Sequence, residues 1–275
     1  MGIFIKVSFK MDGRKASSVE SKEGKMKDVC AVVLAAGKGT RMRSGLIKLA
    51  HPLSSEPLVK FAVNACVDSG VGRIVVVVGY QADKIKSILG EKFEYVYQER
   101  RLGTGDAVRR ATSLLGDFQG ELIVLPGDAP FIKPSTLVEL VHRQRETKSA
   151  ATVLTGLLPR PSHYGRIIRD GYDQIKRIVE SRNAGPEELK IREVNSGVYC
   201  FDTQKLLPLL PILMRDTKAG EYYLTDVIAL LHEHGFRVEA MKVSDPTAIL
   251  GVNTPQELKR AWKVLEKREK QKIRK

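Results

Sequence analysis

Two kinds of hydrophobic pattern alternate along the first 150 residues of the chain. Short, nearly continuous apolar runs are typical of strands covered on both faces of a sheet. They fall at residues 29–36, 73–79, 93–98 and 121–125. Segments with the apolar spacing and the start signals of helices lie between them, at residues 57–70, 82–89, 105–115 and 133–146. This alternation predicts an α/β fold with a doubly wound, mainly parallel sheet.

The pattern becomes antiparallel after residue 150. Strands are predicted at residues 151–157, 165–169, 174–180 and 191–201. The middle two form a hairpin that turns at Asp170-Gly171. The remaining elements are helices at 205–214 and 224–234, a strand at 236–242 and a last helix after Pro255. In that helix Leu258, Trp262 and Leu265 make an apolar stripe. The complete sheet is therefore expected to be mixed, with an antiparallel subregion.

The first strand runs into a loop of small residues, Leu34-Ala35-Ala36-Gly37-Lys38-Gly39-Thr40-Arg41-Met42. Small residues let backbone N–H groups approach a polyphosphate, and Lys38 and Arg41 add positive charge. An ordinary tight turn between a strand and a helix is the alternative interpretation. The loop is not a P-loop, because Val32 and Gly39 stand where that motif needs Gly and Ser or Thr. A dinucleotide fingerprint is excluded as well, since Met42 replaces its third glycine.

Two further segments follow the ends of predicted strands. One is the turn Gly103-Thr104-Gly105, and the other contains Asp128, between Gly127 and Pro130. In doubly wound sheets, ligands bind outside the carboxyl ends of the strands, so these segments and the glycine loop are expected to converge on one crevice. A carboxylate there suits Mg²⁺, which binds through a few protein oxygens and substrate phosphates. Asp128 could equally form a plain Asx turn.

Other polar residues allow two interpretations each. Arg41 and Lys48 could bind phosphate or be surface cations, and Asn195 and Asn253 could be ligands or turn residues. The sequence has no arrangement that indicates a Ser-His-Asp or Cys-His nucleophile.

The net charge of +14 is concentrated near the two ends of the chain. Residues 1–27 hold seven Lys or Arg and three Asp or Glu, and residues 256–275 hold nine and three. Basic tails can attract nucleic acid or anionic membrane, or they can simply keep a protein soluble. We expect a basic, flexible extension at 1–27, one nucleotide-binding domain at 28–268 and a basic tail at 269–275, with no specific nucleic-acid partner.

The sequence also bears on the cellular compartment. It has no apolar run near the roughly 20 residues needed to span a bilayer. The apolar patch at the N-terminus is short and is broken by Lys6, which argues against a secretory signal. The three cysteines, Cys30, Cys66 and Cys200, are odd in number and far apart, which fits a reducing compartment. We therefore expect a cytoplasmic protein with no membrane insertion.

Taken in order, the motifs resemble those of the sugar-1-phosphate nucleotidylyltransferases. The glycine loop is similar to the signature loop of that family. Later segments narrow the resemblance: Gln98 with Leu102–Gly105, Gly127–Pro130, Tyr164–Ile167, Ile178–Glu180, Glu193–Tyr199, Gly220–Asp226 and Gly251–Asn253. Together they resemble the N-terminal uridyltransferase domain of the bacterial bifunctional N-acetylglucosamine-1-phosphate uridyltransferase/glucosamine-1-phosphate acetyltransferases. The resemblance covers about residues 29–265 and implies a Rossmann-like fold of the nucleotide-diphospho-sugar transferase type, with an antiparallel sugar-binding subregion.

The resemblance also implies a reaction and a set of roles. UTP and N-acetylglucosamine 1-phosphate would give UDP-N-acetylglucosamine and pyrophosphate, with Mg²⁺ as cofactor. The uridine would be held by Leu34, Ala35, Ala36, Gly37, Gln98, Gly103 and Thr104. Catalysis would depend on Arg41 and Lys48 at the triphosphate, and the metal would bind Asp128 and Asn253. Gly127 would bind substrate. The sugar would face Gly165, Glu180, Asn195 and Thr225.

Three positions depart from the family pattern. Ile47 replaces the proline that usually precedes the lysine at position 48. Ser55-Glu56 precedes Pro57-Leu58, where the family usually has Gly-Lys or a similar pair. Pro126 replaces the residue before Gly127 that is often aromatic. The hexapeptide-repeat half of the bifunctional enzymes is absent from this sequence, so we expect no acetyltransferase activity. Two alternatives stay open: an enzyme for another sugar 1-phosphate or nucleotide, and a catalytically silent binding protein of the same fold. The sequence does not predict the oligomeric state.

Overall fold

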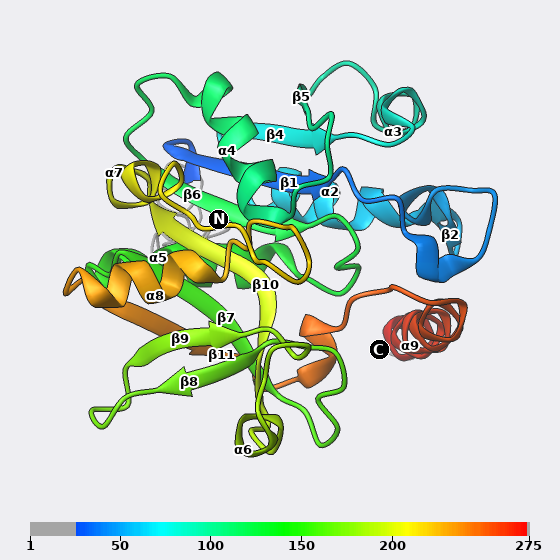
Figure 1. The fold of residues 1–275 in the computed structure, drawn as a ribbon. Coiled ribbons are helices and arrows are strands. Elements are labelled where there is room, and N and C mark those ends of the chain that lie inside the picture. The colour runs from blue at the N-terminus through cyan, green and yellow to red at the C-terminus, as the bar shows by residue number, and fades with distance from the viewer. Residues whose placement is uncertain (1–25, 274–275) are drawn as a thin grey trace, which may run out of the picture.

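A mixed sheet forms the centre of the protein, and the computed structural model describes it within residues 26–273 (Figure 1). The main path of the sheet has the order β11-β7-β10-β6-β1-β4-β5. The strands of this path are β1 (Val29–Ala35), β4 (Arg73–Val78), β5 (Glu94–Tyr97), β6 (Glu121–Pro126), β7 (Ala151–Leu157), β10 (Glu193–Asp202) and β11 (Val238–Lys242). β1 pairs in parallel with β4 and β6, whereas β10 is antiparallel to both β6 and β7. The predicted mixed, mainly parallel α/β sheet is thus confirmed.

A hairpin attaches to the edge of β10. Its strands, β8 (Arg166–Arg169) and β9 (Ile175–Val179), are antiparallel, and β8 pairs with β10. Asp170 closes the turn, because its Oδ1 accepts hydrogen bonds from the backbone N–H groups of Tyr172 (2.8 Å) and Gln174 (3.0 Å). The hairpin predicted around Asp170-Gly171 is therefore present.

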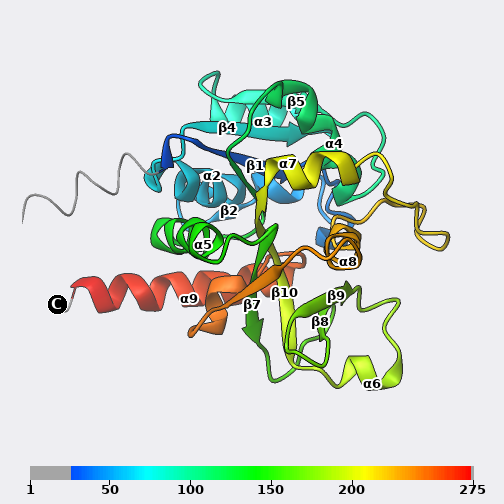
Figure 2. The same cartoon turned by 90° about the vertical axis from the view of Figure 1, so that its left-hand side faces the viewer.

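Helices cover both faces of the sheet (Figure 2). One face carries α2 (Leu58–Asp68), α3 (Ala82–Leu89) and α5 (Pro134–Thr147), and the other carries α4 (Thr104–Leu115), α7 (Thr203–Leu206) and α8 (Asp226–Glu233). A short helix, α6 (Pro186–Leu189), follows β9, and α9 (Pro255–Ile273) is the last element. The small strands β2 (Pro52–Leu53) and β3 (Glu56–Pro57) pair beside α2.

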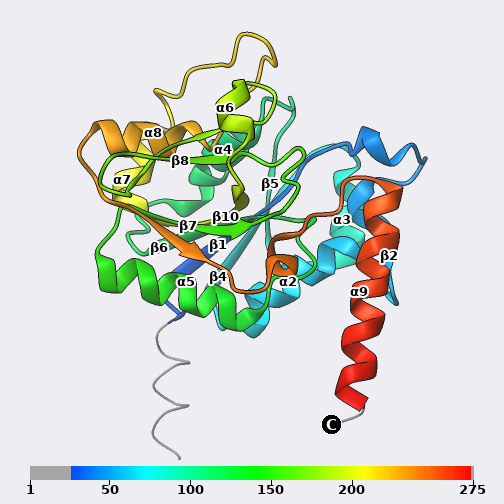
Figure 3. The same cartoon turned by 90° about the horizontal axis from the view of Figure 1, so that it is seen from below.

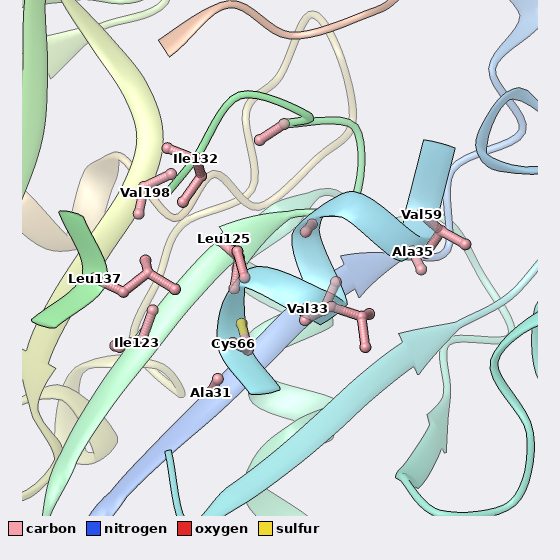
Figure 4. Close-up of a cluster of buried hydrophobic side chains, with 14 of the residues drawn as sticks. Ala31, Val33, Ala35, Val59, Cys66, Ile123, Leu125, Ile132, Leu137 and Val198 are labelled. Carbon is pink, nitrogen blue, oxygen red and sulfur yellow. The ribbon is translucent and has the colours of Figure 1, made fainter. Parts of the chain in front are cut away.

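The core has two halves because successive side chains of a strand point to opposite faces. In β1, Ala31, Val33 and Ala35 pack against the helices of one face, whereas Cys30 and Val32 pack against those of the other. Figure 4 shows the first half, in which side chains from α2, α5 and three strands meet. All five of these β1 residues are fully buried. Because both faces are covered, the polar ligands of the protein have to bind at the ends of the strands.

Two predicted elements need correction. The helix predicted at 205–214 is only α7 followed by a single 3-10 turn, Leu207–Leu209. Pro208 and Pro211 lack the N–H groups that a longer helix would need. The predicted interruption at Asn195-Ser196-Gly197 is a bulge within β10, where the pairing with β7 shifts between Asn195 and Tyr199.

The last helix differs from its predicted packing. Leu258 and Leu265 pack on the core, and Ala261 is buried, but Trp262 is 47 % exposed and is not part of the stripe. The C-terminal end of α9 extends past the body of the protein (Figures 2 and 3). It runs to Ile273, into the segment predicted as a basic tail. The predicted extension at 1–27 lies outside the described residues except for Met26 and Lys27. Within residues 26–273, no helix is long and apolar enough to cross a membrane.

Candidate active site

A cavity of about 690 Å³ opens at the carboxyl ends of the central strands. It lies within the size range of small-molecule sites. Eleven of the residues predicted from the sequence line it: Leu34, Ala36, Gly37, Arg41, Lys48, Gln98, Gly103, Thr104, Asp128, Glu180 and Asn253. These residues come from six separate parts of the chain, and the folding of the mixed sheet and of the segment before α9 brings them together.

The glycine loop forms one wall of this cavity. After β1 the chain turns through Gly37 and Gly39 into a short 3-10 helix, Thr40–Met42. Gly39 has a φ of 66°, and a Cβ atom at this position would overlap the Cβ of Lys48. The backbone of the loop therefore lies directly against Lys48, an approach that only glycine permits.

Lys48 is held at the cavity by its apolar neighbours. It begins a 3-10 turn, Lys48–Ala50, in which Leu49 and Ala50 are buried, and Ile47 before it is 1 % exposed. These side chains anchor the turn in the core, so the backbone of Lys48 has a fixed position. Its own side chain is 14 % exposed and points to the carboxylate of Asp128.

Four polar side chains meet at this point. The ammonium of Lys48 donates to Asp128 Oδ2 and, at 3.0 Å, to Asn253 Oδ1. Arg41 Nη2 donates to the same Asn253 oxygen at 2.9 Å. The backbone supports the cluster, because the Val252 N–H donates to the carbonyl of Asp128 at 3.0 Å. Two cations, one carboxylate and one amide thus form a connected group that joins residues far apart in the sequence.

The same group fits a divalent cation. Asp128 Oδ2 and Asn253 Oδ1 both face one positive charge, the Lys48 ammonium, so their oxygens already converge on a single point. Mg²⁺ is usually bound by one or two protein carboxylates together with substrate phosphates and water. Residues 26–273 contain no cluster of three or more His, Cys, Asp or Glu side chains that could hold a metal on its own. Asp128 and Asn253 could therefore hold a metal ion only together with substrate phosphates and water.

Gln98 is fixed in orientation at the other end of the cavity. It is 4 % exposed, and its Nε2 donates both to the carbonyl of Gly103 (3.0 Å) and to Asp106 Oδ2 (2.9 Å). Both partners are acceptors, so the amide nitrogen has to face them and the amide oxygen has to face away. Asp106 is fully buried and also accepts a hydrogen bond from Arg109 at 2.7 Å. The amide oxygen of Gln98 is therefore a well-oriented acceptor at the cavity wall.

The second glycine turn is tightened by the segment before α8. The N–H of Tyr222 donates to the carbonyl of Leu102 at 2.6 Å, and the N–H of Gly105 donates to the carbonyl of Tyr222 at 2.8 Å. Gly103 has a φ of 96°, and a Cβ there would press on Glu221 and Tyr222. Only glycine fits this crossing of two backbones. Thr104 Oγ1 accepts from the N–H of Leu224 at 3.0 Å, which completes the connection.

Two partly buried carboxyl groups lie at the third side of the cavity, where Glu180 is part of the lining and Asp226 lies behind it. Glu180 Oε1 accepts a hydrogen bond from Thr225 Oγ1 at 3.1 Å. Burial raises the pKa of Glu180. Burial, reinforced by the negative charges of Glu180 and Asp216, raises the pKa of Asp226 to about 6. This region therefore offers acidic acceptors for neutral hydroxyl or amide groups rather than for phosphate.

Five of the predicted site residues do not line the cavity: Ala35, Gly127, Gly165, Asn195 and Thr225. Ala35 points into the opposite half of the core, because Leu34 and Ala36 take the two positions that face the cavity. The N–H of Gly127 donates to the carbonyl of Leu34 at 3.0 Å, behind the cavity floor. The other three support the acidic side: Thr225 contacts Glu180, and the N–H of Asn195 donates to the carbonyl of Gly165 at 3.0 Å.

The sequence analysis missed several residues of the cavity wall, among them Arg101, Arg182, Glu221 and Tyr223. Arg182 lies over the ring of Tyr223, 5.4 Å from its centroid, and 3.9 Å from Glu221. Tyr223 is 6 % exposed, and its hydroxyl is buried without a hydrogen-bond partner among the described residues. For Glu221 and Tyr223 the sequence signal is the run Gly220-Glu221-Tyr222-Tyr223, which combines two aromatic rings with a carboxylate beside the predicted ligand Thr225.

Comparison with known proteins identifies the family of the chain. Three similar proteins, each named "Bifunctional protein GlmU", come from Lactobacillus helveticus (45% identity over 86% of this chain), Geobacter metallireducens (42% over 88%) and Carboxydothermus hydrogenoformans (46% over 84%). The aligned parts are 51%, 52% and 52% of those proteins, so the chain spans about half the length of the relatives that it matches. The sequence profile of the nucleotidyl transferase family matches residues 30–263. The chain is therefore a member of the nucleotidyl transferase family.

Proposed function

We propose that the protein transfers UMP from UTP to N-acetylglucosamine 1-phosphate, forming UDP-N-acetylglucosamine and pyrophosphate. The observation that carries the proposal is the cluster of Arg41, Lys48, Asp128 and Asn253. It offers two cations to a triphosphate and two oxygens to a magnesium ion at the carboxyl end of a parallel sheet. The order of motifs along the chain, which resembles the uridyltransferases, supports this particular pair of substrates.

Gln98 supports the choice of uracil. Its Nε2 is committed to Gly103 and Asp106, so its oxygen is the atom left for a ligand. Uracil presents an N3–H donor, whereas cytosine presents an unprotonated N3 acceptor at the same place. An acceptor of fixed orientation favours the first and repels the second. The pair Gly103–Thr104 lies beside it and can hold the uridine through its backbone.

The triphosphate would lie along the glycine loop. Gly37 and Gly39 leave room for phosphate oxygens close to the backbone, and Lys38 adds a further cation to the lining. Asp128 and Asn253 would hold Mg²⁺. When bound, the metal would neutralise phosphate charge and make the α-phosphorus more electrophilic. Arg41 and Lys48 would bind the phosphate oxygens and stabilise the negative charge that develops on the departing pyrophosphate.

The sugar phosphate would enter from the acidic side of the cavity. Glu180 can accept hydrogen bonds from sugar hydroxyl or amide groups, while Thr225 keeps its carboxylate in place. Asn195 and Gly165 would shape this side from behind. The phosphate of the sugar is already an anion and attacks in line with the departing pyrophosphate, so no general base is required. Catalysis then depends on positioning and on neutralisation of charge.

The test is a substrate panel. Purified protein would be assayed for pyrophosphate release with UTP, dTTP, CTP, ATP and GTP, each with several sugar 1-phosphates and with or without Mg²⁺. We expect release only with Mg²⁺, and fastest with UTP and N-acetylglucosamine 1-phosphate. Equal rates with dTTP would contradict the assignment to uridine nucleotides. A clear preference for another sugar 1-phosphate would identify a related enzyme of the same family, and no release with any pair would favour a binding protein.

A further inference from the structure

Helix α9 begins at Pro255, two residues after Asn253, and its first turn has an unusual set of hydrogen bonds. The N–H of Glu257 donates to Thr254 Oγ1 at 3.2 Å, and the N–H of Thr254 donates to Glu257 Oε2 at 3.1 Å. This reciprocal pair is a capping box, which satisfies two otherwise unpaired donors at a helix N-terminus. Such a pair explains the presence of a glutamate three residues after Thr254.

The capping box does not explain a third hydrogen bond. The N–H of Asn253, one residue before the cap, also donates to Glu257 Oε2, at 2.8 Å. It is the shorter of the two bonds to this oxygen, and it reaches outside the helix. The carboxylate of Glu257 thus holds the backbone of the same residue whose side chain meets Arg41 and Lys48.

The rest of the segment is fixed in a similar way. The N–H of Gly251 donates to the hydroxyl of Tyr164 at 3.1 Å, and the N–H of Val252 donates to the carbonyl of Asp128 at 3.0 Å. Each backbone donor from residue 251 to 254 therefore has a partner. Those of Asn253 and Thr254 share one oxygen, so a single side chain accounts for the C-terminal half of the segment.

We propose that Glu257 is a positioning residue of the active site, which fixes the backbone of Asn253 and so directs its Oδ1 toward the metal and triphosphate. This inference rests on the proposed function, because it concerns the same site. The other oxygen of Glu257, Oε1, has His163 Nδ1 at 4.0 Å, so the histidine does not compete for Oε2. Glu257 touches neither substrate nor metal in this account, and it acts through Asn253 alone.

The experiment compares three variants. Glu257→Ala removes both bonds to Oε2, whereas Glu257→Gln keeps an acceptor oxygen at the same length. Thr254→Ala is the matched control, because it weakens the same helix cap and leaves the bond between Asn253 and Glu257. Thermal unfolding of all three would confirm folding. We expect Glu257→Ala and Thr254→Ala to lower stability by similar amounts, since each removes part of one cap.

Two measurements then separate positioning from capping. The first is hydrogen–deuterium exchange of the Asn253 amide in the protein without metal or nucleotide, which should quicken in Glu257→Ala and stay slow in Glu257→Gln and Thr254→Ala. The second is the affinity for Mn²⁺ in the presence of UTP, followed by electron paramagnetic resonance. It should fall roughly tenfold in Glu257→Ala, and by less than twofold in the other two variants. Unchanged affinity in Glu257→Ala, or an equal loss in Thr254→Ala, would overturn the proposal.

The exchange measurement also separates this proposal from the proposed function. It needs no substrate, so slow exchange in wild type and fast exchange in Glu257→Ala would support the positioning contact even in a protein that releases no pyrophosphate. If wild type does release pyrophosphate but the Asn253 amide exchanges equally fast in all variants, the proposed function stands and the role of Glu257 is wrong.

Discussion

Lys48 Nζ lies 3.0 Å from Asn253 Oδ1, although 205 positions separate the two residues in the chain. The ammonium also contacts Asp128, and Arg41 Nη2 shares the Asn253 oxygen at 2.9 Å. The point between Asp128 and Asn253 thus already suits a cation. This arrangement links the glycine loop after β1 to the segment before the last helix, and it is the basis for the chemistry proposed here.

Asp128→Asn should reduce turnover by about 10²–10³-fold, because the variant removes the charge of the carboxylate that faces this point. The backbone carbonyl of residue 128 still accepts from Val252, so thermal unfolding should remain cooperative. Steady-state pyrophosphate release would measure the effect. Asp117→Asn, an exposed carboxylate before β6, is the control and should retain wild-type rates. Full activity in Asp128→Asn would rule out the metal assignment.

Gln98→Ala should raise the KM for UTP by roughly tenfold and weaken the preference for UTP over CTP, since it removes the oriented acceptor. It should also lower the free energy of unfolding by about 1–3 kcal/mol, because the buried Asp106 loses one of its donors. Kinetics with both nucleotides and urea titration would report the two effects. The exposed Gln119→Ala should change neither. An unaltered UTP-to-CTP ratio in Gln98→Ala would argue against its role at the base.

Asp226 should make stability depend on pH in the acidic range. Burial and the neighbouring Glu180 raise its pKa from 3.8 to about 6, so the native state binds more protons than the unfolded state between about pH 4 and pH 6. The stabilising contribution of this group is therefore complete below about pH 4 and is lost as the pH rises to about 6. Asp226→Asn should thus unfold a few degrees above wild type at pH 7, with a smaller advantage at pH 4.

Thermal melts of wild type, Asp226→Asn and Asp117→Asn across pH 4–8 would check this difference. The control should follow wild type at every pH. A constant gap between wild type and Asp226→Asn over the whole range would show that Asp226 does not titrate in the expected window.

Met26 is the first residue that the structure describes, and its side chain is part of the core. Its side chain is 1 % exposed, and its carbonyl accepts from the N–H of Gly72 at 3.0 Å. Met26→Ala should lower the free energy of unfolding by about 2–5 kcal/mol, the usual loss for a large buried side chain. Met214→Ala provides the same chemical change at a residue that is 82 % exposed, and should cost less than about 0.5 kcal/mol. Urea titration of both variants measures the two free energies of unfolding. Equal losses in the two variants would contradict the core position of Met26.

The sequence predicted the sheet well because its signals are local. Runs such as Arg73–Val78 have the β-branched composition of strands buried on both faces, and Asp170-Gly171 marks its hairpin by turn chemistry. The glycine loop, the turn at Gly103–Gly105 and Asp128 were expected together because parallel strands place their carboxyl ends at one edge. Local periodicity failed at 205–214, where two prolines limit the helix, and at Trp262, which faces solvent.

The remaining parts of the site depend on contacts that no local pattern encodes. Tyr222 crosses the turn at Gly103 from more than a hundred residues away, and this crossing brings Glu221 and Tyr223 to the cavity wall. The contact between Lys48 and Asp128 likewise exists only in the folded chain. Side-chain direction was a further limit: Ala35 belongs to the signature loop, but the alternation of the strand turns it into the core.

The most direct test of the central claim is ³¹P NMR of the purified protein with UTP, N-acetylglucosamine 1-phosphate and Mg²⁺. The account predicts that the resonances of both substrates decrease together, while those of a sugar-linked diphosphate and of pyrophosphate grow in equal amounts. Asp128→Asn in the same buffer should leave both substrates nearly unchanged. Release of pyrophosphate with free UMP and unconsumed sugar phosphate, or no change in the wild-type sample, would contradict the account.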